Sequence, residues 1–181
     1  MRATPTKIAD VLLVEPRVFA DARGFFFESY NERAFAQATG IAAKFVQDNH
    51  SRSVKNTLRG LHYQIRQAQG KLVRAVAGEI FDVVVDIRRS SPTLGLWVGI
   101  HLSAENKKMM WIPPGLAHGF SVLSDYADFL YKTTDYWAPQ HERTLLWNDP
   151  DLAIAWQLAG EPILAVKDRA GKRLSEAEVF D

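Results

Sequence analysis

Short runs in which apolar and polar side chains alternate every two residues occur along most of the chain, and turn residues separate them. The runs are VLLVEPRVF, GFFFESY, KFVQDNHS, KLVRAVA, EIFDVVVDIR, LWVGIHLS, KMMWIPPG, AHGFSVL and ADFLYKTT. A two-residue period is typical of strands with one buried face, and the short intervals between runs predict a β-sandwich or β-barrel. Strands do not alternate with long helices, which disfavours a doubly wound parallel sheet.

Local signals predict a hairpin and short helices. Gly78 lies between two alternating runs in KLVRAVAGEIFDVVVDIR, which indicates a tight hairpin at that point. A helix is predicted over residues 31–39, because Asn31 suits its N-terminal cap and Gly40 suits its end. A weaker helical signal lies at SEAEVF near the C-terminus. We therefore expect a mainly β fold with a few short helices.

Length and composition predict one domain. The chain has 181 residues, of which 47% are hydrophobic, enough for a packed core. No low-complexity linker divides it, and the turn-rich stretch 137–150 is the best candidate for a boundary. We expect a single domain over residues 1–181, with a C-terminal segment of about 138–181 folding back over the barrel.

Charge and motif content disfavour several functions. Lys and Arg total 22 against 21 for Asp and Glu, so the net charge of +1 favours neither nucleic acid nor an anionic membrane as a partner. The chain has no cysteine and no GxGxxG, GxxxxGK[ST] or HExxH motif. The apolar run Val11–Val14 is too short for a signal peptide or a membrane span, so we expect a cytoplasmic protein.

The alternation places two reactive side chains on apolar faces. Tyr131 shares a strand face with Phe129, and Lys71 shares one with Val73. Both are expected to point into an apolar cavity, where each needs a partner or a ligand. The pattern does not decide whether His62 faces inward. A structural role for each of these side chains is the simpler interpretation of the pattern alone.

A metal site is the main rival interpretation of the polar residues. No two histidines stand two or four residues apart, the spacing at which one strand or helix offers two ligands. A site would have to assemble scattered histidines. The five histidines are His50, His62, His101, His118 and His141.

Six segments, taken in order, carry a resemblance to a known family. They are RGFFFES, FVQDNHSRS, LRGLHYQ, QGKLVRAVAGEIFDVVVDIR, WIPPGLAHGF and YKTTDYW. Together they resemble the dTDP-4-dehydrorhamnose 3,5-epimerase family over nearly the whole chain. The resemblance implies a cupin-like antiparallel β jelly-roll barrel, a homodimer, and catalysis without metal or other cofactor. The HxH ligand pair of metal-dependent cupins is replaced here by His62, Tyr63 and Gln64.

The resemblance implies an epimerase in dTDP-L-rhamnose biosynthesis. Its substrate would be dTDP-4-dehydro-6-deoxy-D-glucose, inverted at carbons 3 and 5 to give dTDP-4-dehydro-L-rhamnose. The alternatives are a single-centre epimerase or ketoisomerase of another dTDP-deoxysugar pathway and, ranked third, a non-catalytic or metal-binding cupin.

The resemblance also implies roles for individual residues. His62 in LRGLHYQ would take the proton next to the ketone, and Asp168 would orient its imidazole. Lys71 would stabilise the enolate oxygen, and Tyr131 would return a proton on the opposite face of the ring. The remaining matched positions imply substrate binding, with Trp137 as a further stacking residue. They are Arg23, Glu28, Gln47, Asn49, Arg59, His118, Glu142 and Lys167.

Overall fold

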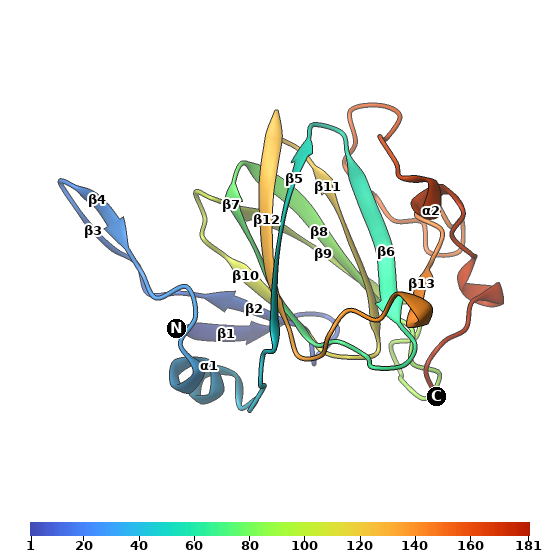
Figure 1. Cartoon of the computed structure of the whole chain (residues 1–181), viewed down its shortest axis with the longest axis horizontal. Helices are drawn as coiled ribbons and strands as arrows, with labels where there is room; N and C mark the ends of the chain where they lie inside the picture. The colour runs from blue at the N-terminus through green and yellow to red at the C-terminus, as the bar shows by residue number, and fades with distance from the viewer.

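Two antiparallel β-sheets make up most of the molecule (Figure 1). The computed structural model describes residues 1–181, the whole sequence. The strands are β1 (Arg2–Pro5), β2 (Leu12–Glu15), β3 (Phe19–Asp21), β4 (Gly24–Phe26), β5 (Gln47–Val54), β6 (Leu58–Gln64), β7 (Lys71–Ala77), β8 (Glu79–Asp86), β9 (Trp97–Ser103), β10 (Met109–Ile112), β11 (Leu116–Val122), β12 (Tyr126–Thr133) and β13 (Glu142–Thr144). The helices are α1 (Glu32–Thr39) and α2 (Val166–Arg169), with 3₁₀ turns η1 (Pro139–His141) and η2 (Leu174–Glu176).

The strand order identifies the architecture. The six-stranded sheet has the order β1-β2-β10-β7-β12-β5, and the five-stranded sheet has the order β13-β6-β11-β8-β9. Neighbours in both sheets run antiparallel, and most are not consecutive in the sequence. The two sheets face each other as an antiparallel jelly-roll barrel. This confirms the fold class predicted from the alternating runs.

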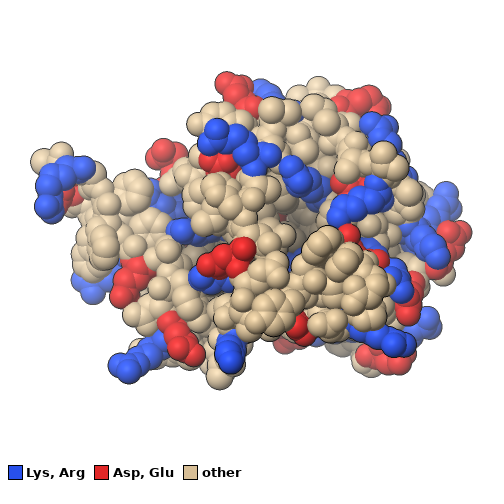
Figure 2. Space-filling view, viewed as in Figure 1, with Lys and Arg blue, Asp and Glu red and all other residues tan.

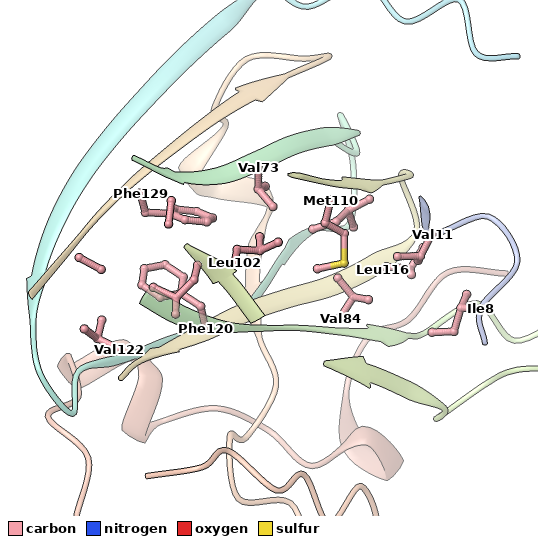
Figure 3. Packing of buried hydrophobic residues seen from close by; sticks show 14 residues of the cluster. Ile8, Val11, Val73, Val84, Leu102, Met110, Leu116, Phe120, Val122 and Phe129 are labelled. Carbon is pink, nitrogen blue, oxygen red and sulfur yellow. The ribbon is translucent and has the colours of Figure 1, made fainter. Parts of the chain in front are cut away.

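The main hydrophobic core lies between the two sheets (Figure 3). β7 and β12 contribute Val73 and Phe129 from one sheet, and β8 and β11 contribute Val84 and Phe120 from the other. All four are at most 4% exposed. Burial of an aromatic or branched side chain of this kind contributes about 1.5 to 3 kcal/mol. The core fills one part of the barrel interior.

The hairpin predicted at Gly78 is wrong. β7 pairs with β10 and β12, whereas β8 pairs with β9 and β11, so Gly78 is a corner between the sheets. Its φ is 67°, and a Cβ there would lie 2.0 Å from the carbonyl oxygen of Tyr126. The alternation of apolar and polar residues on both sides of Gly78 does not distinguish a hairpin from a corner between sheets. In either case both strands keep one buried face.

The helix predicted over residues 31–39 is confirmed as α1. Asn31 accepts a hydrogen bond from the Ala34 amide at 3.0 Å, and the Gly40 amide donates to the Ala36 carbonyl. Phe35 is 1% exposed and packs edge-on against Trp111 of β10. None of the helices combines the length and the apolar character of a membrane span.

The C-terminal segment packs on the outer face of the five-stranded sheet. Leu145, Leu152 and Trp156 share a second core with Leu61 and Val83, which point away from the barrel interior. This path returns the chain to β6, where α2 lies beside the barrel.

At the other end of the molecule the hairpin β3–β4 projects away from the barrel (Figure 1). Its side chains Phe19, Phe25 and Phe26 are exposed.

Candidate active site

A cavity of about 680 Å³ opens into the barrel from the side that carries β5, β6 and the C-terminal segment. Both sheets contribute to its wall, and residues 163–168 cover part of it. Most of the residues singled out in the sequence line it. They are Gln47, Asn49, Arg59, His62, Lys71, His118, Tyr131, Glu142, Lys167 and Asp168.

His62 and Asp168 meet in this cavity although 106 positions separate them. His62 Nε2 lies 2.5 Å from Asp168 Oδ1, and the carboxylate side chain is only 2% exposed. A carboxylate in this place accepts the Nε2 proton and fixes the ring, which leaves Nδ1 as the nitrogen that can take a proton. The buried carboxylate also stabilises the imidazolium that forms. This arrangement is one that can accept a proton at Nδ1.

Tyr131 and Lys71 lie on the opposite sheet. They belong to the neighbouring strands β12 and β7, and Tyr131 packs against Phe129 with ring centroids 5.5 Å apart. The predicted inward orientation of both side chains is confirmed. His62 comes from β6 of the five-stranded sheet, so the histidine and the tyrosine occupy opposing walls of one cavity.

Burial sets the protonation of both groups. It raises the pKa of Tyr131, with a further contribution from the negative charge of Glu142, so the phenol keeps its proton at neutral pH. Burial lowers the pKa of Lys71 to about 8, against the opposing effects of Asp82 and Glu142. At pH 7 most Lys71 side chains are therefore charged. A protonated phenol and an ammonium group suit a proton donor and an oxyanion stabiliser, respectively.

A second histidine–aspartate pair lies beside the first. His118 on β11 is the direct cross-strand partner of His62, and its Nε2 lies 2.9 Å from Asp82 Oδ1. Burial lowers the pKa of His118 and raises the pKa of Asp82. Sequence reasoning missed Asp82. The available signal was an acidic residue at an inward position of the apolar run IFDVVVD.

Polar side chains at the cavity mouth hold one another in place. Gln47 Nε2 donates to Asn49 Oδ1 at 2.9 Å, and Gln47 Oε1 accepts from the Trp137 amide at 3.1 Å. Lys167 Nζ donates to both oxygens of Glu142, at 2.9 and 3.1 Å. Gln47 and Lys167 therefore each have hydrogen-bond partners within the chain at the mouth.

The single chain leaves two of the predicted binding residues outside the cavity. Arg23 is at the end of the β3–β4 hairpin, with 90% of its side chain exposed, and it pairs with Asp21 at 2.6 Å. Glu28 accepts a hydrogen bond from Asn31 at 3.0 Å. Neither residue lines the cavity.

Charge is mixed on the face of the molecule that carries β5 and β6. Figure 2 shows basic and acidic side chains interspersed on the face that carries β5 and β6, with no uniformly charged area. The cations of the cavity are Arg59, Lys71 and Lys167. No three or more histidine, cysteine, aspartate or glutamate side chains come together as a possible metal site.

The fold is a cupin-like jelly-roll barrel, and its cavity holds an oriented histidine and a protonated tyrosine on opposing walls, groups that acid–base catalysis can use. The profile of the family described as dTDP-4-dehydrorhamnose 3,5-epimerase matches residues 5–176. The chain belongs to this family of epimerases.

Relatives of known name agree with this assignment. The dTDP-4-dehydrorhamnose 3,5-epimerase of Pseudomonas aeruginosa is 67% identical over 180 residues, covering 99% of each chain. That of Salmonella typhimurium is 57% identical over 173 residues, covering 95% of this chain and 94% of the relative.

Solved structures share the fold. The dTDP-6-deoxy-D-glucose-3,5-epimerase of Legionella pneumophila, crystallised with dTDP-4-keto-L-rhamnose, superposes with a TM-score of 0.95 at 51% identity, covering 98% of this chain and 94% of that one. A 3'-monoepimerase from Streptomyces bikiniensis, bound to dTDP-quinovose, gives a TM-score of 0.89 at 35% identity, covering 97% and 88%. The family fold therefore serves both double and single epimerases.

Proposed function

We propose that this enzyme inverts carbons 3 and 5 of dTDP-4-dehydro-6-deoxy-D-glucose and releases dTDP-4-dehydro-L-rhamnose, in dTDP-L-rhamnose biosynthesis and without a cofactor. One observation carries the proposal: the His62–Asp168 pair and Tyr131 lie on opposing walls of the same cavity. Inversion needs groups on both faces of the sugar, because one group on one face restores the starting configuration. The names of the relatives, dTDP-4-dehydrorhamnose 3,5-epimerase, support a dTDP-sugar substrate and inversion at carbons 3 and 5.

The proposed chemistry begins with the hydrogens next to the ketone. His62 Nδ1 accepts a proton from carbon, and the electron pair moves to the carbonyl oxygen to give an enolate. The Lys71 ammonium stabilises this oxyanion, a contribution of roughly 3 to 4 kcal/mol in comparable sites. Tyr131 then donates its proton to the opposite face of the same carbon. After each inversion His62 holds an extra proton and Tyr131 lacks one, so both exchange with solvent before the next.

The remaining cavity residues are proposed to bind the nucleotide. Arg59 and Lys167 suit the pyrophosphate, because guanidinium and ammonium groups donate several hydrogen bonds to phosphate oxygens. Trp137 is exposed at the mouth, where its ring can stack on thymine or a sugar face. Gln47, Asn49, His118 and Glu142 complete the proposed set.

We propose that Arg23 and Glu28 bind substrate within a homodimer. Both lie outside the cavity of their own chain, and in this proposal they contact substrate in the cavity of a second copy. The exposed phenylalanines of the β3–β4 hairpin suit such a contact. We further propose that residues 1–181 form one domain and that the enzyme is cytoplasmic.

Deuterium counting tests the proposal. The purified protein, treated with a chelator, is incubated with dTDP-4-dehydro-6-deoxy-D-glucose in heavy water, and the sugar is analysed by mass spectrometry and NMR. Deuterium at carbons 3 and 5, with both centres inverted, is the expected result. Deuterium at one carbon would establish the single-centre alternative, for which the Streptomyces bikiniensis relative gives precedent. No deuterium would overturn epimerase activity on this substrate.

A further inference from the structure

Trp137 lies on an irregular turn at the cavity mouth. The turn comprises residues 134–138, which connect β12 to η1 beside β6 (Figure 1). Trp137 is 58% exposed, whereas its neighbour Ala138 is 5% exposed. Backbone amides and carbonyls outside helices and strands need other partners where water does not reach them. The groups that bond to this backbone therefore determine where the Trp137 ring lies.

Gln64, the last residue of β6, bonds to the turn on both sides of Trp137. Its Oε1 accepts from the Ala138 amide at 2.8 Å, and its Nε2 donates to the Tyr136 carbonyl at 3.2 Å. Nε2 also donates to the Gln67 carbonyl at 2.8 Å, so both N–H groups of the amide are used. The Gln64 side chain thus joins the turn to the end of β6 and to the loop that follows it.

Two further glutamines bond to the same turn. Gln69 Nε2 donates to the Asp135 carbonyl at 2.9 Å, and Gln47 Oε1 accepts from the Trp137 amide at 3.1 Å. Each of the residues 135–138 therefore has one backbone group bonded to a glutamine side chain. Gln64 makes two of these four bonds and is 5% exposed, whereas the other two glutamines are half-buried.

We propose that Gln64 is a positioning residue of the nucleotide subsite, which fixes the turn so that the Trp137 ring lies where the base of the nucleotide sugar can stack on it. A ring that is already held in place loses less conformational entropy when a ligand binds. Gln64 acts through the backbone of the turn, because its amide is bonded to the chain. The inference rests on the proposed function, which supplies the nucleotide as the ligand at the mouth.

Gln64→Met tests the proposal, because methionine has a similar length, carries no charge and cannot make these bonds. The Kd for dTDP, measured by calorimetry, should rise about 5-fold or more, as for loss of base–aromatic stacking. Trp137→Ala should raise Kd at least as much. In the Trp137→Ala background, Gln64→Met should change Kd by less than about twofold, because no ring is left to position. An unchanged Kd in either single variant, or equal fold-changes in the two backgrounds, would overturn the proposal.

Asn106→Leu is the matched control. The Asn106 side-chain amide also bonds to loop backbone, donating to the His101 carbonyl at 2.9 Å and accepting from the Ser103 amide at 3.1 Å. It lies outside the cavity. The Kd for dTDP in this variant should equal the parent value.

Steady-state kinetics separate positioning from a general loss of structure. Gln64→Met should raise KM for the nucleotide sugar and leave kcat within about twofold, because the Trp137 ring would contact the base and not the reacting carbons. A variant that is only less completely folded would have a lower kcat at an unchanged KM. That result would overturn the proposal.

Gln64→Glu provides a second variant in case Gln64→Met does not fold. A carboxylate has the same shape and keeps the acceptor for the Ala138 amide, but it cannot donate to the Tyr136 carbonyl. Kd for dTDP should rise in the parent background and not in the Trp137→Ala background. Repulsion between the new charge and the pyrophosphate would raise Kd equally in both backgrounds, and this outcome would overturn the proposal.

A measurement without ligand distinguishes failure of this inference from failure of the proposed function. In protein labelled with 5-fluorotryptophan, the ¹⁹F signal of Trp137 is identified by its loss in Trp137→Ala. It should shift or broaden in Gln64→Met and stay in place in Asn106→Leu. An unchanged signal in Gln64→Met would overturn the proposal. A changed signal, together with a parent protein that does not bind dTDP, would support positioning of Trp137 by Gln64 and refute the proposed function.

Discussion

Two neighbouring histidines differ in environment because of the carboxylates that hold them. His62 and His118 face each other across β6 and β11, and each has its own aspartate through Nε2. The side chain of His62 is 21% exposed, whereas that of His118 is 8% exposed. The ring open to the cavity suits proton exchange with solvent, and the enclosed ring suits a fixed hydrogen bond. Residue type alone does not distinguish the two.

Loss of the proposed base should abolish proton exchange. In His62→Ala we expect the rate of deuterium incorporation to fall by roughly 100-fold to 10,000-fold, the usual contribution of a positioned base. Binding of dTDP, measured by calorimetry, should remain because the nucleotide contacts other residues. Parent-like exchange in this variant would refute the assignment of His62.

Loss of the proposed acid should separate exchange from inversion. Tyr131→Phe retains His62 and Lys71, so the proton on the His62 face should still exchange with heavy water. The variant lacks the phenolic proton on the other face and should return the sugar uninverted, as NMR of the recovered sugar would show. Epimerised product at the parent rate would exclude Tyr131 as the acid.

Lys71 should set the alkaline limit of activity. Its pKa is about 8, and the ammonium form is the one that stabilises an oxyanion. We expect kcat/KM, which reports the free enzyme, to fall as the pH rises through 8. Lys71→Arg keeps its charge at all these pH values and should lack this limb, although its maximum rate should be lower. A limb that persists in Lys71→Arg would belong to another group.

The sequence predicted which side chains face the barrel interior better than it predicted which residues those side chains contact. Two-residue alternation placed Tyr131 and Lys71 in the barrel, because strand geometry determines the face on which a side chain lies. It could not place Asp168 beside His62, since α2 reaches β6 only through the irregular C-terminal segment; this residue came from the family resemblance. Asp82 was missed because the apolar run around it resembles ordinary core.

At the scale of elements, Gly40 and Gly78 show which structural features the local sequence pattern determines. Gly40 ends α1 as predicted, because helix capping depends on neighbours within a few residues. Gly78 was predicted in a hairpin and forms a corner between sheets, because strand partners are chosen by the whole barrel. Local signals therefore predicted the helix cap at Gly40 but not the strand pairing around Gly78.

The same two glycines give a stability prediction. Gly40→Ala should cost about 1 kcal/mol, since φ is 73° but nothing lies within 4 Å of the added Cβ. Gly78→Ala should cost about 2 kcal/mol or more, because the strained φ is combined with a backbone oxygen at 2.0 Å. Urea unfolding at equilibrium measures both. Equal losses would mean that the corner adjusts without cost.

At the scale of the whole molecule, the cavity and the projecting hairpin lie on different parts of the chain. The cavity contains the proposed acid and base, whereas Arg23 lies on the β3–β4 hairpin away from the barrel (Figure 1). The net charge of +1 gives little long-range attraction for an anionic substrate, and the face shown in Figure 2 carries charges of both signs. Nucleotide binding must then depend on cations placed locally, and Arg23 is one of them in the proposed dimer.

Mixed dimers test this arrangement. Arg23→Ala should raise KM for the nucleotide sugar, and His62→Ala should be inactive. If the hairpin of one copy serves the cavity of the other, a dimer of one Arg23→Ala chain and one His62→Ala chain contains one complete site. After unfolding and refolding an equal mixture, half the dimers are of this type, so activity at low substrate should reach about a quarter of the parent value. Activity no higher than the average of the two separate variants would show that Arg23 does not bind substrate in the partner's cavity.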